Sequence, residues 1–255
     1  MPYKISIIGA GNVAWHLAKA LDAAGHTLFE VYSRNPNHAA QLAQPYRAFA
    51  VNEVRLLKDD IDILLVCVSD DGIKEVAEQL KHRKFLIAHT GGAVDMNVLE
   101  GTSAYYGVFY PLQTLSAGKP VNFFDVPLCI EGNNKAAEMQ LKALADTISN
   151  NVQYITTEQR RYLHLAAVFA NNFSNAMYVS AAKILEAQGL DFKLLRPLIK
   201  ETAEKIQALS TQTAQTGPAK RHDTTTLQKH LDLLPNGSDE EKIYKLLSEI
   251  ISGRY

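Results

Sequence analysis

The stretch Gly9-Ala10-Gly11-Asn12-Val13-Ala14 decides the fold, because it lies between a strand-like run and a helix-like run. Residues 3–8, which precede it, are rich in β-branched side chains, as is typical of a buried parallel strand. Residues 13–24, which follow it, carry an apolar stripe at helical spacing, and Gly25 marks the end of that helix. The stripe consists of Val13, Leu17, Ala20, Leu21 and Ala24. The sequence therefore predicts a strand, a glycine turn and a helix in direct succession.

A glycine turn in this setting is where a dinucleotide pyrophosphate binds. Gly9 makes the tight turn, Gly11 lets the backbone approach the phosphates, and Ala14 allows close packing of helix on strand. The N–H groups at the start of the helix then hold the anion. Glycines also serve as plain turn residues, and the short pattern alone does not separate the two uses. The strand before it and the helix after it favour the nucleotide site.

The end of the second strand indicates which dinucleotide binds. Residues 28–32 form an apolar strand that ends in Ser33 and Arg34. An NAD-binding unit usually carries Asp or Glu about 20 residues past the glycines, whereas an arginine accommodates a 2′-phosphate. Arg34 offers a planar fork of donors, and Ser33 can add a hydroxyl bond. We therefore predict NADP(H) as the cofactor; the alternative reading of Arg34 is a solvated residue at a strand end.

The composition is ordinary for a soluble globular protein, with 255 residues, 47% hydrophobic, 21% charged and a net charge of −1. Basic and acidic residues are mixed along the chain, so the sequence contains no basic segment of the kind that binds nucleic acid. No stretch approaches the roughly 20 apolar residues of a membrane span, and the amino terminus lacks a signal-type run. We expect a cytoplasmic protein that binds neither nucleic acid nor membrane and whose ligand is a small-molecule substrate.

The cysteines and histidines do not indicate a metal site. Cys67 and Cys129 both lie inside apolar runs, so we interpret them as small core residues and not as a disulfide or a metal pair. The eight histidines show no ligand spacing such as His-x-x-x-His. We predict that the protein binds no metal.

Strand and helix patterns alternate through the first half of the chain. Apolar strands are expected at residues 61–68, 84–88, 106–110, 126–130 and 152–155. Helices are expected at residues 71–80 and 134–149. This alternation predicts an α/β fold with a Rossmann-type, doubly wound and mostly parallel sheet.

The pattern becomes helical throughout from about residue 156. Helical runs cover residues 158–188, 191–213, 223–234 and 239–251. Ser238, with Glu241 three residues on, has the spacing of a capping box. No repeat and no low-complexity linker separates the halves. We therefore expect a nucleotide-binding domain at 1–155 and an all-α domain at 156–255.

Ligands of an open parallel sheet lie beyond the carboxyl ends of its strands. The first loop that this rule selects holds Ser69 and Asp70, which we expect to border the nicotinamide ribose and the diphosphate. Asp70 or Asp71 can instead cap the next helix. We regard capping as the better interpretation for at least one of the two.

Two further loops lie at the same edge of the predicted sheet. His89 and Thr90 precede two glycines, which allow the backbone to approach a ligand or simply make a turn. The segment 110–114, Tyr-Pro-Leu-Gln-Thr, ends the next extended piece. Both are placed where a substrate would meet the nicotinamide.

The helical half supplies polar groups for the other wall of a cleft. His164, Asn171 and Asn172 share one side of an otherwise apolar helix if the spacing is α-helical. A histidine near the nicotinamide can donate the proton that accompanies hydride transfer, whereas a buried histidine bonded to another helix or to water is the ordinary alternative. In a later loop, Arg221 can clamp a substrate anion or pair with Asp223.

Together these motifs resemble a family of bacterial NADP-dependent oxidoreductases that join a Rossmann-like domain to a helical domain of unknown function. The motifs are residues 9–14, His89-Thr90-Gly91-Gly92, Tyr110-Pro111-Leu112-Gln113-Thr114, residues 162–173, and Thr216-Gly217-Pro218 with Arg221 and Asp223. The family is similar to pyrroline-5-carboxylate reductase, ketopantoate reductase and the deazaflavin-dependent NADP reductases, within the 6-phosphogluconate dehydrogenase-like superfamily. The resemblance spans nearly the whole chain.

The resemblance implies particular roles for particular residues. It implies NADP binding by Gly9, Gly11, Asn12, Val13, Ser33 and Arg34, and a homodimer built through the helical half. Where the family commonly has His before Pro-Leu-Gln, this chain has Tyr110, which can donate a hydrogen bond but is a poorer acid–base group near pH 7. The lysine and asparagine pattern of the related reductases has no clean counterpart. His164 with Asn172 is the nearest match by spacing.

Two functional hypotheses follow from the sequence. The first is an NADPH-dependent reductase of a small carbonyl or imine compound, in which His164 with Asn171 or Asn172 orients and protonates the substrate. The second is an NADP-binding regulator or sensor without turnover, which the absent lysine and Tyr110 favour. A methyltransferase-like domain is disfavoured because Arg34 has no role in it.

Overall fold

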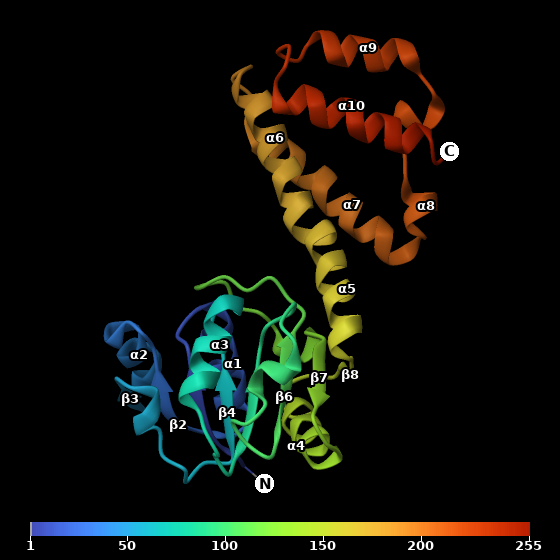
Figure 1. The fold of residues 1–255 in the computed structure, drawn as a ribbon. Helices are drawn as coiled ribbons and strands as arrows, with labels where there is room; N and C mark the ends of the chain where they lie inside the picture. The colour runs from blue at the N-terminus through green and yellow to red at the C-terminus, as the bar shows by residue number, and fades with distance from the viewer. Residues whose placement is uncertain (1) are drawn as a thin grey trace. The chain divides into compact units, whose positions relative to one another are not determined.

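A computed structural model describes residues 2–255 and divides into two compact units. We call them the N-terminal unit, up to Asn172, and the C-terminal unit, from Phe173. The N-terminal unit contains one sheet with the strand order β3-β2-β1-β4-β5-β6-β7-β8 (Figure 1). The strands are β1 (Lys4–Ile8), β2 (Thr27–Tyr32), β3 (Phe49–Val51), β4 (Ile63–Val66), β5 (Leu86–His89), β6 (Tyr106–Pro111), β7 (Leu128–Gly132) and β8 (Val152–Tyr154).

The sheet is mostly parallel, as the sequence predicts. Six strands, from β3 to β6 in the order above, run in one direction. Strand β7 pairs antiparallel with β6, and β8 is parallel to β7. The carboxyl ends of β1, β2, β4, β5 and β6 therefore meet at one edge, where a doubly wound sheet binds its ligands.

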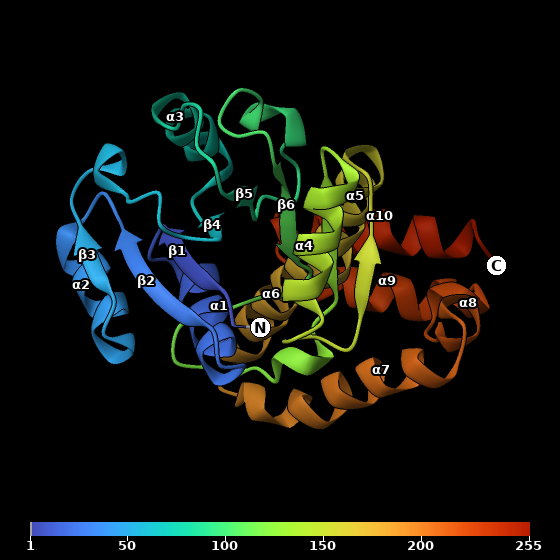
Figure 2. The ribbon, with the colours of Figure 1, turned by 90° about the horizontal axis from the view of Figure 1, so that it is seen from below.

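Helices cover both faces of this sheet, because alternate side chains of each strand point to opposite faces. Helices α1 (Asn12–Ala23), α2 (Pro36–Ala43) and α4 (Lys135–Ala145) contribute to one core, with Ile7 and Leu65 of the sheet. Helix α3 (Asp70–Gln79) belongs to the other core, with Leu64 and Val66. Figure 2 shows α1 and α3 on opposite sides of the strands. The doubly wound α/β fold is thereby confirmed.

Both cysteines are buried and free, as expected of core residues. The expected strands and helices of this unit are present within a few residues, but α2 and β3 do not appear among the predictions. Both lie between Arg34 and the next predicted strand. Strand β3 is only three residues long and largely exposed, so it carries almost no hydrophobic pattern.

One long helical path follows the sheet, as predicted, but it is not α-helical throughout. Helix α5 (Thr157–Ala167) and helix α6 (Ser174–Glu186) are joined by a π-helical segment, Val168–Phe173. The C-terminal unit continues with further helices. They are η6 (Phe192–Leu195), α7 (Arg196–Ala208), α8 (Thr211–Ala214), η7 (Ala219–Arg221), α9 (Thr224–Asp232) and α10 (Asp239–Ser252).

The helix ends show where local chemistry differs from expectation. The Ser238 hydroxyl accepts from the Glu241 N–H, but the Glu241 carboxylate accepts from the N–H of Gly237, so the expected reciprocal box is only half formed. A complete capping box instead starts α5, where Thr156 and Gln159 bond each other's N–H groups.

The compact units divide later than the domain boundary expected from the sequence. The change to helical structure does occur at Thr157, directly after residues 1–155. The first turns of α5 nevertheless belong with the sheet, because Arg160 is buried and bonded to Glu131 of β7. In the described part of the chain, every helix is too short or too polar to span a lipid bilayer.

Candidate functional site

The glycine turn has the geometry that the sequence predicts. Gly9 has a φ of 111°, and its N–H donates to the Tyr32 carbonyl over 2.7 Å. A Cβ atom at Gly9 would lie 2.1 Å from the Cys67 carbonyl oxygen. Because both the backbone conformation and the missing side chain are required, only glycine fits this position.

The start of α1 is open toward solvent. Gly11 is its N-cap residue, offers no side-chain cap, and has no atom within 4 Å of where a Cβ would lie. The first N–H groups of this helix are therefore free to meet an anion. The side chain of Asn12 accepts from the Ala117 N–H over 3.1 Å, so its oxygen is used by the loop after β6. Val13 is half-buried and packs on the core.

A cleft of about 290 Å³ runs from the glycine turn to the end of β2. It is lined by Gly9, Gly11, Ser33, Arg34 and Ser69 among the predicted cofactor residues. The other predicted ones, Asn12, Val13, Asp70, His89 and Thr90, are not among its lining residues. The structure thus brings together half of the predicted cofactor set in one cleft.

The charge at the β2 end of this cleft fits a phosphate better than a ribose hydroxyl, whereas the carboxylate of Glu75 lines the cleft on α3. Arg34 is exposed and makes no hydrogen bond or ion pair with residues 2–255. The carboxylate of β2, Glu30, is buried and accepts from the Lys58 N–H and the Ser6 hydroxyl, so it does not line the cleft. The end of β2 therefore offers Ser33 and a free guanidinium, which fits the 2′-phosphate of NADP.

His38 also lines the cleft and was not predicted from the sequence. It lies on α2, whose N-cap Asn35 accepts from the Asn37 N–H and whose first residue is Pro36. The Asn-Pro pair directly after Arg34 is an available signal for a helix start at that point.

The loop after β4 corrects one expectation. Neither Asp70 nor Asp71 caps α3, since Ser69 is its N-cap residue and makes no side-chain cap bond. The two aspartates instead lie in the first helical turn, where their charge is favourable near the positive helix end. An oxygen of Asp70 lies 2.9 Å from where a Cβ of Gly91 would be, so this carboxylate packs on the loop after β5.

Two buried side chains, His89 and Thr90, fix the loop after β5 by hydrogen bonds. His89 is fully buried, and its Nδ1 accepts from the Gly91 N–H over 3.1 Å. Burial, with a smaller contribution from the Arg160 charge, lowers the pKa of His89 to about 4. Thr90 is buried as well, and its hydroxyl donates to the Val66 carbonyl. Both side chains therefore support the loop from its buried side, and Nε2 of His89 has no hydrogen-bond partner there.

Tyr110 of β6 and His164 of α5 form a hydrogen-bonded pair next to this loop. The Tyr110 hydroxyl and Nδ1 of His164 are 3.0 Å apart. Gly92 lies directly against both, since a Cβ there would be 2.6 Å from Nδ1 of His164 and 3.0 Å from Cζ of Tyr110. Burial, above all, raises the pKa of the Tyr110 hydroxyl to about 12. The phenol therefore keeps its proton at neutral pH.

A cavity of about 540 Å³, lined by both polar and apolar side chains, opens beside this pair. His164, Asn171 and Asn172 all line it, together with Tyr110 and the segment after β6. The π-helical segment contains both asparagines, so the α-helical spacing used to predict their common side does not strictly apply. Such segments are rare and are frequent at functional sites.

Arg221 and Asp223 do not form the pair considered as an alternative. Among residues 2–255 no ion pair joins them. Asp223 caps α9 and accepts from the hydroxyl and the N–H of Thr226, and these bonds lower its pKa.

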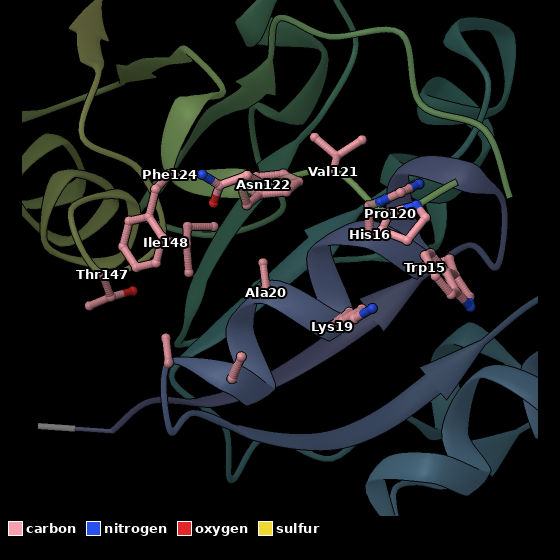
Figure 3. A pocket seen from close by; sticks show the side chains of 13 residues that line it. Trp15, His16, Lys19, Ala20, Pro120, Val121, Asn122, Phe124, Thr147 and Ile148 are labelled. Carbon is pink, nitrogen blue, oxygen red and sulfur yellow. The ribbon is translucent and has the colours of Figure 1, made fainter. Parts of the chain in front are cut away.

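Another cavity, of about 220 Å³, lies along α1 and contains none of the predicted site residues (Figure 3). Trp15, Lys19, Val121 and Phe124 lie around it. Within residues 2–255 there is no group of three or more His, Cys, Asp or Glu side chains arranged to hold a metal ion.

Two family models match the chain. One is described as NADP oxidoreductase coenzyme F420-dependent and covers residues 4–92; the other, DUF2520, is a domain of unknown function and covers residues 126–251. A solved protein of Bacteroides fragilis, described as a "putative NADP oxidoreductase", is 40% identical over 99% of both chains, with a TM-score of 0.93. The chain belongs to this NADP oxidoreductase family. The resemblance inferred from its motifs is thereby confirmed.

The family shares its fold with reductases of other kinds. A 1-pyrroline-5-carboxylate reductase from Streptococcus pyogenes is 14% identical over 99% of both chains, with a TM-score of 0.67. An imine reductase from Myxococcus stipitatus, solved in complex with NADP+, is 16% identical over 98% of this chain and 92% of the other, with a TM-score of 0.63. Likeness at this level shows the fold alone. No curated protein matches the chain in sequence.

Proposed function

We propose that the protein is an NADP(H)-dependent oxidoreductase that transfers hydride between the nicotinamide and a small carbonyl or imine substrate. One observation carries this proposal: the Tyr110–His164 pair lines a cavity with neutral polar groups, beside the loops at the same sheet edge as the glycine turn. A hydrogen-bonded acid–base pair next to a cofactor edge is what reduction of a carbonyl or imine requires.

The cofactor residues that we propose are those that line or border the dinucleotide cleft. The turn from Gly9 to Val13 would hold the diphosphate through the free N–H groups of α1. Ser33 and Arg34 would hold the 2′-phosphate, and Ser69 with Asp70 would border the ribose and diphosphate. His89 and Thr90 would act through the backbone of the loop that they hold. When bound, NADPH supplies the hydride.

The Tyr110–His164 bond determines which proton His164 can offer. Because the phenol of Tyr110 stays protonated at neutral pH, it can donate to Nδ1 of a neutral His164, which places the ring proton on Nε2. Nε2 is then the nitrogen left to bond a carbonyl oxygen or an imine nitrogen. When His164 carries protons on both nitrogens, Nδ1–H would instead donate to the Tyr110 oxygen, and Nε2 would give its proton to the oxygen, or for an imine the nitrogen, that hydride addition leaves negatively charged. His164 would then be neutral, and Asn171 or Asn172 would orient the substrate.

The cavity lining favours a substrate without a carboxylate. Gln113, Thr114, Asn171 and Asn172 are neutral hydrogen-bonding groups, and no Lys or Arg occurs among the described lining residues. A buried carboxylate needs a cationic partner, whereas an imine or a simple carbonyl does not. Among the compounds considered from the sequence, we therefore place cyclic imines ahead of 2-oxo acids.

A sensor without turnover is the second candidate. The observation that favours it is Tyr110, whose pKa of about 12 makes the phenol a poor proton donor at neutral pH. In that case the Tyr110–His164 pair would report on bound NADP(H) and not act on a substrate.

We further propose a homodimer built through the C-terminal unit, and a cytoplasmic location. The exposed apolar side chains of that unit support the dimer, because such faces on helices are normally covered by another surface.

The proposed activity is tested by NADPH oxidation with a panel of aldehydes, ketones, 2-oxo acids and cyclic imines, measured for wild type and His164→Ala. We expect turnover with a neutral imine or carbonyl, and a loss on the order of 10²-fold or more in the variant, as for removal of a general acid. Tyr110→Phe, which keeps the ring but loses the hydroxyl, should give a smaller loss. Tight NADPH binding without turnover of any compound would favour the sensor.

A further inference from the structure

Helix α5 and the loop after β5 are joined at successive turns of the helix. The Met96 N–H donates to the Thr157 hydroxyl over 3.3 Å. One turn on, a guanidinium nitrogen of Arg160 donates to the Val94 carbonyl over 2.5 Å. Another turn on, His164 packs against Gly92. The loop thus runs along the helix from Met96 to Gly92, with one contact per turn.

Arg160 is the buried centre of this row of contacts. Its side chain is 1% exposed, and its other terminal nitrogen donates to the Glu131 carboxylate over 2.6 Å. Glu131, on β7, also accepts from the N–H and the hydroxyl of Thr157, at 2.8 and 2.7 Å. Arg160 therefore ties together three segments that are distant in sequence: α5, strand β7 and the loop at Val94.

Stability alone does not account for a buried pair of this kind. Replacing a buried ion pair by apolar side chains of similar volume is often neutral or stabilising, because desolvation of both charges is costly. Arg160 even leaves its Nε without a partner in the described structure. The pair does fix the orientation of the Arg160 side chain, because its planar guanidinium bonds Glu131 and the Val94 carbonyl through two different nitrogens.

We propose that Arg160, held by Glu131, is a positioning residue that sets the register of α5 on the loop and so places His164 against Gly92 and Tyr110. The inference rests on the proposed function, because it concerns the same His164. A slip of α5 by one residue would move His164 by about 1.5 Å along the helix and turn it by about 100°. Misplacement by about 1 Å can cost on the order of 10²-fold in rate.

The test compares conservative variants of the pair with a matched control elsewhere in the sheet. Arg160→Lys keeps the charge but cannot reach Glu131 and Val94 through separate nitrogens, and Glu131→Gln keeps the shape but loses the charge. The control is Arg83→Lys, because Arg83 similarly bonds a carboxylate, Asp59, and a carbonyl, Leu57, but lies before β5 at the opposite end of the strand. All three variants keep a polar side chain, so they are expected to fold.

Two readouts are measured on each variant. Nitrogen NMR of His164 reports whether Nδ1 still receives the Tyr110 hydrogen bond, and kinetics give kcat beside the NADPH dissociation constant. We expect Arg160→Lys to lose the His164–Tyr110 signature and to lower kcat on the order of 10²-fold with NADPH affinity unchanged, and Glu131→Gln to act in the same direction but less. Arg83→Lys should lower stability and change neither readout.

The proposal is overturned if Arg160→Lys and Glu131→Gln lower stability as Arg83→Lys does and leave the His164 signals in place. The NMR readout needs no substrate, so it decides the positioning role even if wild type reduces no carbonyl or imine. That second result would count against the proposed function and not against the role of Arg160.

Discussion

In the N-terminal unit apolar side chains fill two cores, one on each face of the sheet, whereas in the C-terminal unit the only buried hydrophobic residue among those described is Ala219. Leu194, Leu198 and Leu233 are 66%, 62% and 81% exposed. The helices of the C-terminal unit are amphipathic, and the apolar face of such a helix normally packs against another apolar surface. The first unit has a buried apolar interior of its own, and the second leaves most of its large apolar side chains exposed, which supports the proposed dimer.

The two units also differ in polar chemistry. Every buried polar residue among those described lies in the N-terminal unit, including His89 and Arg160. So do all the candidate cofactor residues and His164, Asn171 and Asn172. The difference indicates that the N-terminal unit carries the candidate chemistry, and it is the reason why we propose the C-terminal unit as the dimer surface.

The largest effect is expected from Gly9→Ala, which tests whether the N-terminal unit depends on its own close packing. A Cβ at 2.1 Å from the Cys67 carbonyl cannot be accommodated without moving β1 or β4, and φ is unfavourable as well. We expect a loss of several kcal/mol of unfolding free energy or no folded protein, measured by denaturant unfolding. Gly11→Ala, where a Cβ meets no atom, should fold normally. Equal stability of the two variants would contradict this view.

The next effect concerns the proposed dimer surface of the C-terminal unit. If Leu233 lies in the proposed dimer interface, Leu233→Glu should weaken self-association on the order of 10²-fold or more, because a carboxylate would then be buried without a partner. Leu56→Glu, at a leucine 55% exposed in the N-terminal unit, is the matched control and should leave association unchanged. Sedimentation velocity over a dilution series measures both. A wild-type monomer at all concentrations would refute the dimer.

Acid sensitivity should arise from the N-terminal unit. The pKa of His89 is lowered to about 4 in the folded protein from an ordinary 6.5, so the unfolded chain binds its proton first. Stability from this group is therefore full above pH 6.5 and falls as pH drops toward 4, by up to about 3 kcal/mol at 1.4 kcal/mol per pKa unit.

Unfolding free energies from pH 7 to pH 4 measure this dependence. His89→Asn, whose side-chain oxygen can replace Nδ1 as the acceptor for Gly91, should lose this part of the slope. His230→Asn, at an exposed histidine of the C-terminal unit, should keep it. If His89→Asn and wild type have the same slope, His89 is not held neutral by burial.

Much of the fold could be predicted because its signals are local. The apolar strand before Gly9, the stripe of α1 and the strand that ends at Tyr32, just before Ser33 and Arg34, are each encoded within a few residues. Strand β3 was beyond this kind of reasoning, since three exposed residues carry no periodicity. The π-helical segment was missed because an α-helical repeat was assumed through residues 158–188.

The individual residues of the candidate site could be predicted from the sequence, but the hydrogen bonds between them could not. The sheet-edge rule selected the loops at His89 and Tyr110, and helical spacing selected His164. The bond between Tyr110 and His164 joins residues 54 positions apart, and that between Glu131 and Arg160 joins residues 29 apart. Such pairs follow from how α5 docks on the sheet edge, which no local pattern specifies.

We infer that the N-terminal unit binds NADP(H) through its own cleft and selects it by the 2′-phosphate. The most direct measurement is the affinity of wild type and Arg34→Ala for NADPH and NADH, by fluorescence titration at fixed ionic strength. We predict that wild type prefers NADPH and that Arg34→Ala loses about 10- to 100-fold for NADPH only, as expected for a charge-assisted hydrogen bond. Equal wild-type affinities for NADPH and NADH would contradict the account.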